Sequence, residues 1–138
     1  MPNSASTTKT IEQSEFFPSV EPMEIYDALL SGPKHTALTG GGHATGSTKA
    51  GGKFTAWDGY IEGKNLELEP GVRILQEWTT SNWPEGAPAS HLEWKFLAKD
   101  GGTEVKMTHS NVPASQAASY TQGWIDYYWK PMKVYFAR

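Results

Sequence analysis

The sequence predicts an α+β fold in which a curved antiparallel sheet of about six to seven strands is covered by a long C-terminal helix. From residue 53 to residue 111, short segments of alternating polarity are separated by Gly, Pro and Asp turns, which is typical of strands with one buried face. From Ala114 to Phe136, apolar and aromatic residues recur every three or four positions, which predicts a helix with a broad apolar face. A one-sided sheet needs a cover, and this helix is the obvious candidate.

Composition limits the classes of protein that the chain can belong to. Its 138 residues can form one domain with a hydrophobic core, and the absence of cysteine excludes disulfides, thiol catalysis and thiolate metal sites. Twelve basic and 15 acidic residues give a net charge of −3, which disfavours a nucleic-acid partner. No apolar run approaches the ~18 residues of a membrane span, and the N-terminal ten residues hold no apolar signal core. We therefore expect a cytoplasmic protein without a membrane partner.

The N-terminal part predicts a tail, a strand and two short helices. Residues 1–7 are rich in Ser and Thr, so we expect a disordered tail before a single domain over residues 8–138. Thr8–Phe17 alternates loosely and predicts the first strand. Pro22 begins a first short helix, and a second is expected within Pro33–Leu38.

A glycine-rich connector leads to the main group of strands. The connector, Thr39–Gly52, is expected to be irregular, with a short strand near His43–Gly46. It does not fit a phosphate-binding loop, because Gly52 stands where that motif requires Lys. The strands that follow are expected at Phe54–Trp57, Tyr60–Glu69, Val72–Thr79, Ser90–Leu97 and Thr103–Asn111. Gly63 interrupts the second of these strands and predicts a bulge or bend there.

Two residues interrupt the pattern of the C-terminal helix. Pro131 cannot donate a backbone hydrogen bond and clashes with the carbonyl of Tyr127, so we predict a kink or a wide turn between these residues. Gly123 costs the helix about 1 kcal/mol relative to Ala. We interpret it as the place where the helix approaches the sheet closely.

Five motifs resemble one known family. They are Gln76–Trp78 (QEW), Ser81–Gly86 (SNWPEG), Gly102–Val105 (GTEV) and Gly123–Tyr128 (GWIDYY), together with FTAWDGYIEGKN from Phe54. In this order they resemble homologues of the heat-shock-protein-90 ATPase activator, specifically its C-terminal domain. The resemblance covers roughly residues 10 to 136. It implies the helix-grip fold of the START, polyketide-cyclase and birch-pollen-allergen superfamily. We expect no counterpart of the separate N-terminal domain of that activator, because only about ten residues precede the first strand.

The sequence contains no pattern typical of catalysis. The four histidines, His35, His43, His91 and His109, lie far apart and have no metal-ligand spacing, so we expect no metal and no cofactor. There is no nucleophile elbow, and the carboxylates of the strands fall on the solvated face by alternation. We expect a protein that is not an enzyme. His109 alternates onto the apolar face, where we interpret it as a structural histidine with satisfied hydrogen bonds.

Two functions from different classes follow from the resemblance. The first is a co-chaperone that docks on a heat-shock-protein-90-type chaperone and alters its ATPase cycle, with exposed Trp83 as a contact residue. The alternative for Trp83 is a turn residue folded back over the edge of the sheet.

The second function is a carrier for a small hydrophobic ligand held between the sheet and the helix. The expected lining residues are Leu29, Trp78, Trp94, Phe96, Met107, His109, Trp124 and Tyr128. The alternative is that the same rings fill the space completely. A structural, partner-binding module with neither activity is a third class that fits the sequence.

Overall fold

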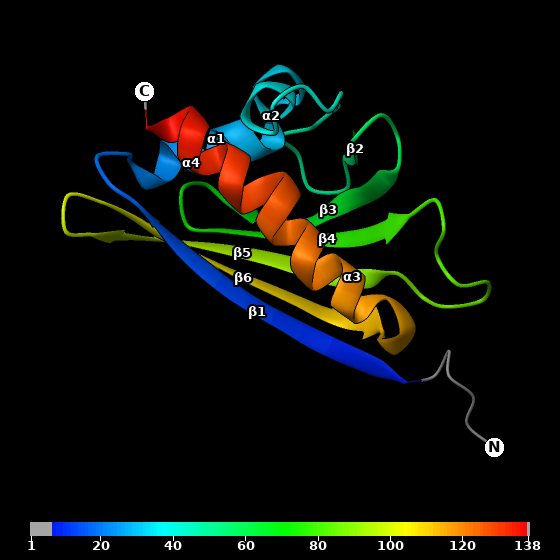
Figure 1. The fold of residues 1–138 in the computed structure, drawn as a ribbon. Coiled ribbons are helices and arrows are strands. Elements are labelled where there is room, and N and C mark those ends of the chain that lie inside the picture. Colours follow the sequence, from blue (N-terminus) through cyan, green and yellow to red (C-terminus); the bar gives the residue numbers. More distant parts are fainter. Residues whose placement is uncertain (1–6, 138) are drawn as a thin grey trace.

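Six strands form one antiparallel sheet, and the C-terminal helix crosses its inner face (Figure 1). The strands are β1 (Thr8–Phe17), β2 (Lys53–Ala56), β3 (Ile61–Glu69), β4 (Arg73–Thr80), β5 (Ser90–Lys99) and β6 (Gly102–Pro113). Their order is β1-β6-β5-β4-β3-β2, so the first strand of the chain pairs with the last. The predicted fold class is confirmed.

The computed structural model describes residues 7–137. The predicted tail, residues 1–7, lies outside the described residues except for Thr7, whose carbonyl oxygen accepts a hydrogen bond from the Ala114 N–H. Within the described range, no helix has the length and apolar character that crossing a membrane requires.

Two short helices, α1 (Pro22–Leu30) and α2 (Gly32–Leu38), follow β1 and lie beside the C-terminal end of the long helix (Figure 1). Pro stands in the first turn of both helices, where its missing N–H leaves no bond unmade. The Ser31 hydroxyl accepts a hydrogen bond from the Lys34 N–H and so caps α2.

The C-terminal helix has three segments: α3 (Ala114–Trp124), the π-helical η2 (Ile125–Trp129) and α4 (Lys130–Phe136). In η2 the Lys130 N–H donates to the Ile125 carbonyl, five residues back. This wider turn lies directly before Pro131, whose ring would clash with the Tyr127 carbonyl in a regular α-helix. The predicted wide turn between Tyr127 and Pro131 is confirmed.

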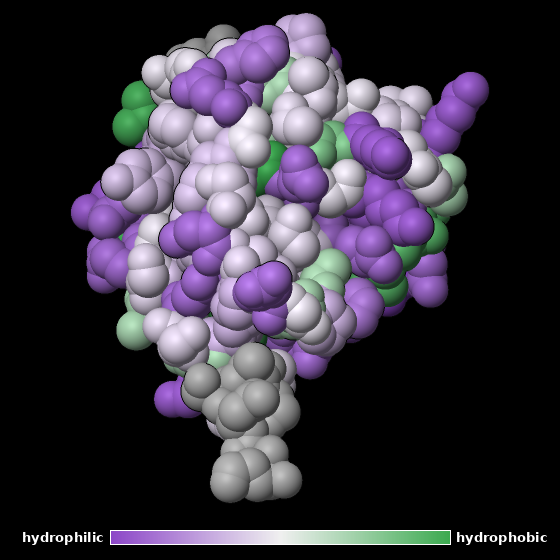
Figure 2. All heavy atoms as spheres, turned by 90° about the vertical axis from the view of Figure 1, so that its right-hand side faces the viewer, coloured by the Kyte–Doolittle hydropathy of each residue, from purple (hydrophilic) through white to green (hydrophobic). Residues whose placement is uncertain are grey.

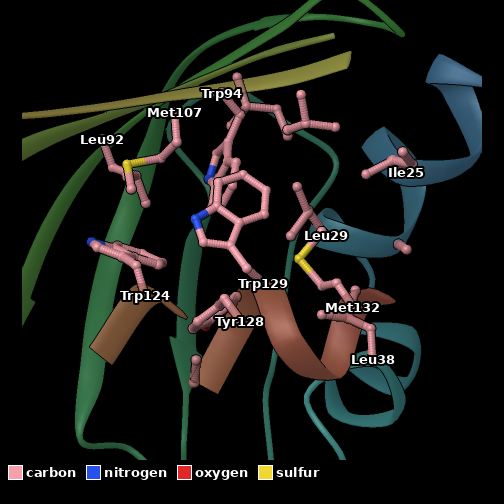
Figure 3. Packing of buried hydrophobic residues seen from close by; sticks show 14 of the residues in the cluster. Ile25, Leu29, Leu38, Leu92, Trp94, Met107, Trp124, Tyr128, Trp129 and Met132 are labelled. Carbon is pink, nitrogen blue, oxygen red and sulfur yellow. The ribbon is translucent and has the colours of Figure 1, made fainter. Parts of the chain in front are cut away.

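Large rings of the helix and the sheet fill the core (Figure 3). Trp94 of β5 packs against Trp124 and Trp129 of the helix, with ring centroids 5.6 and 5.7 Å apart. At the other end of this cluster, Met132 of α4 is buried, as are Leu29 of α1 and Leu38 of α2, and Figure 3 shows the three together. Burying one such side chain stabilises the fold by about 1.5–3 kcal/mol, so packing outweighs the cost of Gly123 in the helix.

The irregularity of β3 lies two residues beyond the predicted position. Pairing with β4 runs unbroken through Gly63 and shifts register between Asn65 and Glu67. A Cβ atom at Gly63 would lie 2.0 Å from the Glu77 carbonyl oxygen, so glycine is needed here for close approach. The predicted bulge at Gly63 is therefore wrong.

The glycine-rich connector is pinned to the sheet at two points. Thr45 forms an isolated bridge with Thr55, which confirms the short extended segment expected near His43–Gly46. The fully buried Asn65 amide donates to the carbonyls of Ser47 and Lys49 and accepts from the Gln76 amide. The connector is thus held by a side chain inside the sheet.

Candidate functional site

An aromatic cleft of about 430 Å³ lies between the C-terminal helix and the β2–β3 turn. Its walls come from three parts of the chain: the β2–β3 turn with the first residue of β3, strand β4, and one face of α3 and η2. Seven of its ten lining residues are aromatic. The lining residues are Trp57, Tyr60, Ile61, Trp78, Ser119, Tyr120, Gly123, Trp124, Tyr127 and Tyr128.

The β2–β3 turn places one wall of the cleft. Trp57, Asp58 and Gly59 all have positive φ angles (50°, 60° and 89°), which reverse the chain at the predicted Asp-Gly turn. Asp58 exchanges hydrogen bonds with the backbone of His43, so the connector also supports this turn. The Trp57 ring meets the Tyr127 ring edge-on, with centroids 5.3 Å apart. These two rings join the turn to the helix at one end of the cleft.

Buried hydroxyls organise the inner part of the cleft. The Tyr120 hydroxyl lies 2.6 Å from the Gln116 side-chain oxygen, to which it donates, and 2.7 Å from the Thr80 hydroxyl. Burial raises the pKa of Tyr120 to about 12, so the phenol stays neutral. Its ring lies 5.2 Å from the ring of Trp78, which is almost fully buried at the base. The inner wall is therefore rigid and uncharged.

Gly123 lies in the helical wall of the cleft and does not approach the sheet closely. The only atom that a Cβ at this position would meet is Cδ2 of Tyr127, at 3.9 Å. The expectation of close helix–sheet approach at Gly123 is therefore wrong. Tyr127 follows one turn later and is 56 % exposed, whereas its neighbour Tyr128 is buried.

The eight residues expected to hold a ligand are all buried but fall into three groups. Trp78, Trp124 and Tyr128 line the cleft. Leu29 and Trp94 border an interior gap of about 10 Å³, together with those three residues. This volume is at the lower limit for one water molecule. Phe96, Met107 and His109 line neither space and pack in the core.

His109 has both ring nitrogens satisfied inside the core. Trp124 Nε1 donates to Nδ1 of His109 over 3.1 Å. Ser90 donates to the Trp78 carbonyl, so its oxygen accepts from His109 Nε2, 2.8 Å away. Burial lowers the pKa of His109 to about 3, which keeps the ring neutral. The interpretation of His109 as a structural histidine is confirmed.

His35 is a second buried histidine, and no sequence pattern pointed to its partner. Its Nδ1 lies 2.9 Å from the Leu29 carbonyl, and its Nε2 lies 2.7 Å from the Tyr128 hydroxyl. A carbonyl only accepts, so Nδ1 carries the proton and Nε2 accepts from Tyr128. Burial lowers the pKa of His35, against the opposing effect of its bond to Leu29. The bond to Tyr128 links α2 to the helical wall of the cleft.

Trp83 is half-buried, which corrects the expectation that it is exposed. Its ring stacks on Tyr120 with centroids 6.1 Å apart and planes 18° apart, and its Nε1 donates to the Pro88 carbonyl. Its ring also lies 6.0 Å from the ring of Trp78 on β4, so Trp83 is folded back against the helix and a central strand rather than over an edge of the sheet. Trp83 therefore fixes the β4–β5 loop against the back of the cleft wall.

Side chains that carry a charge at neutral pH do not line the cleft. None of its lining residues is Asp, Glu, Lys, Arg or His. Between residues 7 and 137, no three His, Asp or Glu side chains are grouped in a way that would hold a metal ion. On the outer face of the sheet, Arg73 pairs with Glu67 at 2.6 Å and with Glu93 at 2.5 Å. The cleft thus offers shape, aromatic surface and hydroxyls, but no charge.

Comparison with solved structures shows the fold in other proteins. A crystal structure of an HSP90 activator from Plasmodium falciparum superposes with a TM-score of 0.82 at 24% identity and covers 96% of this chain and 97% of that one. The solution structure of the Aha1 dimer from Colwellia psychrerythraea has a TM-score of 0.72 at 19% identity over 86% and 90% of the two chains. At these identities the likeness establishes the fold alone.

Sequence comparison identifies the family. The chain is 33% identical over 125 residues to the activator of 90 kDa heat shock protein ATPase homolog of Dictyostelium discoideum, covering 89% of this chain and 32% of that protein. It is 33% identical over 117 residues to the human activator homolog 1, covering 83% of this chain and 33% of that protein. The chain therefore spans about a third of the length of these relatives. The family model for activator of Hsp90 ATPase homolog 1-like proteins matches residues 19–137, and the chain belongs to this family.

Proposed function

We propose that this protein is a non-catalytic accessory of an Hsp90-type chaperone and alters the rate of the chaperone's ATPase cycle. The observation that carries the proposal is the family match over residues 19–137, with relatives that are named as activators of this ATPase. The uncharged cleft and the histidines satisfied within the core are consistent with a role in binding rather than catalysis.

The β4–β5 loop is the proposed contact surface. It carries the SNWPEG motif and lies on the right-hand side in Figure 1, the side that faces the viewer in Figure 2, where many side chains are hydrophilic. Stacking on Tyr120 and the hydrogen bond to Pro88 hold Trp83 in place, so the loop loses little conformational entropy on binding. Exposed Glu85 lies beside Trp83 in this loop and supplies a charge at the rim of the contact.

The test is the ATPase rate of a purified Hsp90-type chaperone with and without saturating amounts of this protein. We expect a changed rate with the wild type and a weaker effect with Trp83→Ala or Glu85→Arg. The matched control is Glu12→Arg, the same charge reversal at an exposed position of β1, and it should behave like the wild type. An unchanged rate at saturation would refute the proposed function.

A second candidate function, binding a small hydrophobic molecule, is favoured by the aromatic cleft. Its volume of about 430 Å³ lies within the range of roughly 300–1,000 Å³ that is typical of small-molecule sites. Native mass spectrometry of freshly purified protein, before and after organic extraction, tests whether a molecule is carried. Only the mass of the free chain in both samples would count against a tightly held ligand.

A further inference from the structure

Two lysines form an unfavourable cross-strand pair at the β2 edge of the sheet (Figure 1). Lys53 of β2 lies directly opposite Lys64 of β3, and both are exposed on the outer face. Thr55 exchanges both of its backbone hydrogen bonds with Thr45 of the connector, so the backbone groups of Lys53, two residues earlier, also point away from β3. Lys53 and Lys64 therefore form a non-hydrogen-bonded pair, in which side chains lie closest, and like charges there destabilise a sheet.

No carboxylate compensates this pair. Neither lysine forms an ion pair, whereas five other basic side chains between residues 7 and 137 do. Glu77 of β4 is the second cross-strand neighbour of Lys64. The Glu77 carbonyl oxygen points towards β3, where it is the nearest atom to a Cβ built at Gly63, so Lys64 and Glu77 form a hydrogen-bonded pair. Side chains lie farther apart in such a pair, and the nearest charge to Lys64 is therefore another lysine.

Protection of the sheet edge explains only one of the two lysines. A lysine on an edge strand discourages pairing with another chain, which accounts for Lys53. Strand β3 is not at the edge, and a glutamate in place of Lys64 would attract Lys53 and leave the edge protected. The sheet has a second lysine pair, Lys95 of β5 opposite Lys106 of β6, but there Glu93 lies 4.0 Å from the Lys95 ammonium. Of these two pairs, the one at the edge has no counter-charge.

The chain beside this pair adds positive charge and no negative charge. From residue 28 to residue 57 the sequence has no Asp or Glu, although the whole protein has a net charge of −3. Lys49 lies in this stretch, and its carbonyl oxygen accepts a hydrogen bond from the side-chain amide of Asn65, the residue after Lys64. This bond holds Lys49 at the end of the β2–β3 ladder, where it is exposed. We call Lys49, Lys53 and Lys64 the lysine corner.

The rest of the outer face limits the size of an anionic partner. It carries carboxylates close to the lysine corner, among them Glu62, Glu67 and Glu77. A long nucleic acid or a flat anionic membrane would meet these carboxylates together with the lysines and would be repelled by them. A short acidic segment of a protein is small enough to contact the lysine corner alone.

We propose that the lysine corner is a docking surface for a short acidic segment of a partner protein, whose carboxylates supply the counter-charges that Lys53 and Lys64 lack. Exposed charges act mainly on the rate and specificity of association, so this contact should be weak and sensitive to salt. None of the three lysines lines the cleft or belongs to the β4–β5 loop, so the inference is independent of both candidate functions.

The probes are an octaglutamate peptide with blocked ends and its uncharged counterpart, octaglutamine. Each is titrated into the full chain at low salt while the backbone amide signals in a ¹⁵N spectrum are recorded. We expect saturable shifts at residues 49–53 and at Lys64 with octaglutamate and none with octaglutamine. The affinity for octaglutamate should fall at least tenfold between about 20 mM and about 200 mM salt, because ions screen exposed charges.

Lys53→Glu tests whether the repulsion serves binding. This variant places opposite charges at the close pair with Lys64, so its melting temperature should rise while octaglutamate binding weakens at least tenfold. A merely structural role of Lys53 would not separate the two effects in this way. Lys106→Glu is the matched control, because it makes the same charge reversal within the other cross-strand lysine pair, and it should bind octaglutamate like the wild type.

Each adverse result overturns a distinct part of the proposal. Unchanged binding in Lys53→Glu, or equal weakening in Lys106→Glu, would show that the peptide does not bind at the lysine corner. Single-stranded oligothymidylate of eight nucleotides and vesicles of phosphatidylcholine with phosphatidylserine are titrated in parallel. If either binds more tightly than octaglutamate and loses this binding in Lys53→Glu, the partner is a nucleic acid or a membrane and the inferred class is wrong. If no probe binds at low salt, the lysine corner is not a docking surface.

Discussion

Acid should destabilise this protein through the buried histidines, and His109 allows the magnitude to be calculated. The pKa of His109 is about 3 in the folded state, against an ordinary value of 6.5. Below pH 6.5 the unfolded chain therefore binds a proton that the folded chain excludes. The stability that the neutral His109 contributes to the folded state is fully present above pH 6.5 and is lost as the pH falls from 6.5 towards 3. Between pH 8 and pH 5 this loss is about 2 kcal/mol.

The assay is urea unfolding followed by Trp fluorescence at pH 8 and pH 5, for the wild type and for His109→Gln. Glutamine keeps a donor for Ser90 and an acceptor for Trp124 but does not titrate. The variant will be less stable at pH 8, because its shape differs, but it should lose about 2 kcal/mol less than the wild type on acidification. His35, whose pKa is also lowered, acts in the same direction in both proteins.

Exposed His91 provides the matched control. His91→Gln removes the same type of group from the surface and should retain the pH dependence of the wild type. If His109→Gln loses as much stability between pH 8 and pH 5 as the wild type does, then His109 is not held neutral by burial and the reasoning fails.

Two substitutions in β3 test how the sheet is held. Asn65→Ala removes the amide that bonds to Ser47 and Lys49. We expect the free energy of unfolding in urea to fall by about 2–3 kcal/mol and proteolysis within residues 47–52 to become faster. Cleavage at the wild-type rate would contradict the proposed anchoring of the connector. Gly63→Ala places a Cβ 2.0 Å from the Glu77 carbonyl oxygen and should cost about 2–3 kcal/mol. Gly123→Ala is its control and should gain up to about 1 kcal/mol; equal effects of the two would refute the distinction drawn between these glycines.

The strands and helices were predictable because the residues that determine them lie close together in the sequence. Thr8–Phe17 was expected as a strand and is β1 with the same bounds, since alternation and the following proline are both visible in the sequence. The wide turn before Pro131 was predictable for the same reason, because the clash of a proline ring with the carbonyl four residues back does not depend on tertiary structure.

The site was predicted only in part, because its residues meet through tertiary packing. Trp78, Trp124 and Tyr128 were identified from their positions on the dry faces of β4 and the helix. Trp57 was not predicted as a site residue. It follows the last residue of β2 and has a positive φ angle, so the alternation of the strand does not predict where its side chain points. The partner of His35 is 93 residues away along the chain, and no periodicity connects them.

The position of the cleft follows from how the long helix lies on the sheet. Segment α3 contacts β1 and β6, the two strands at one edge of the sheet, whereas α4 contacts α2. Strands β2 and β3 lie at the opposite edge of the sheet, so α3 leaves a gap above them. Gly123 and Tyr127 face this gap from the helix, and Trp57 faces it from the turn after β2. The regular apolar stripe of the helix therefore builds the core, and the two places where its pattern is broken, Gly123 and the π-helical turn, shape the surface that remains open for binding.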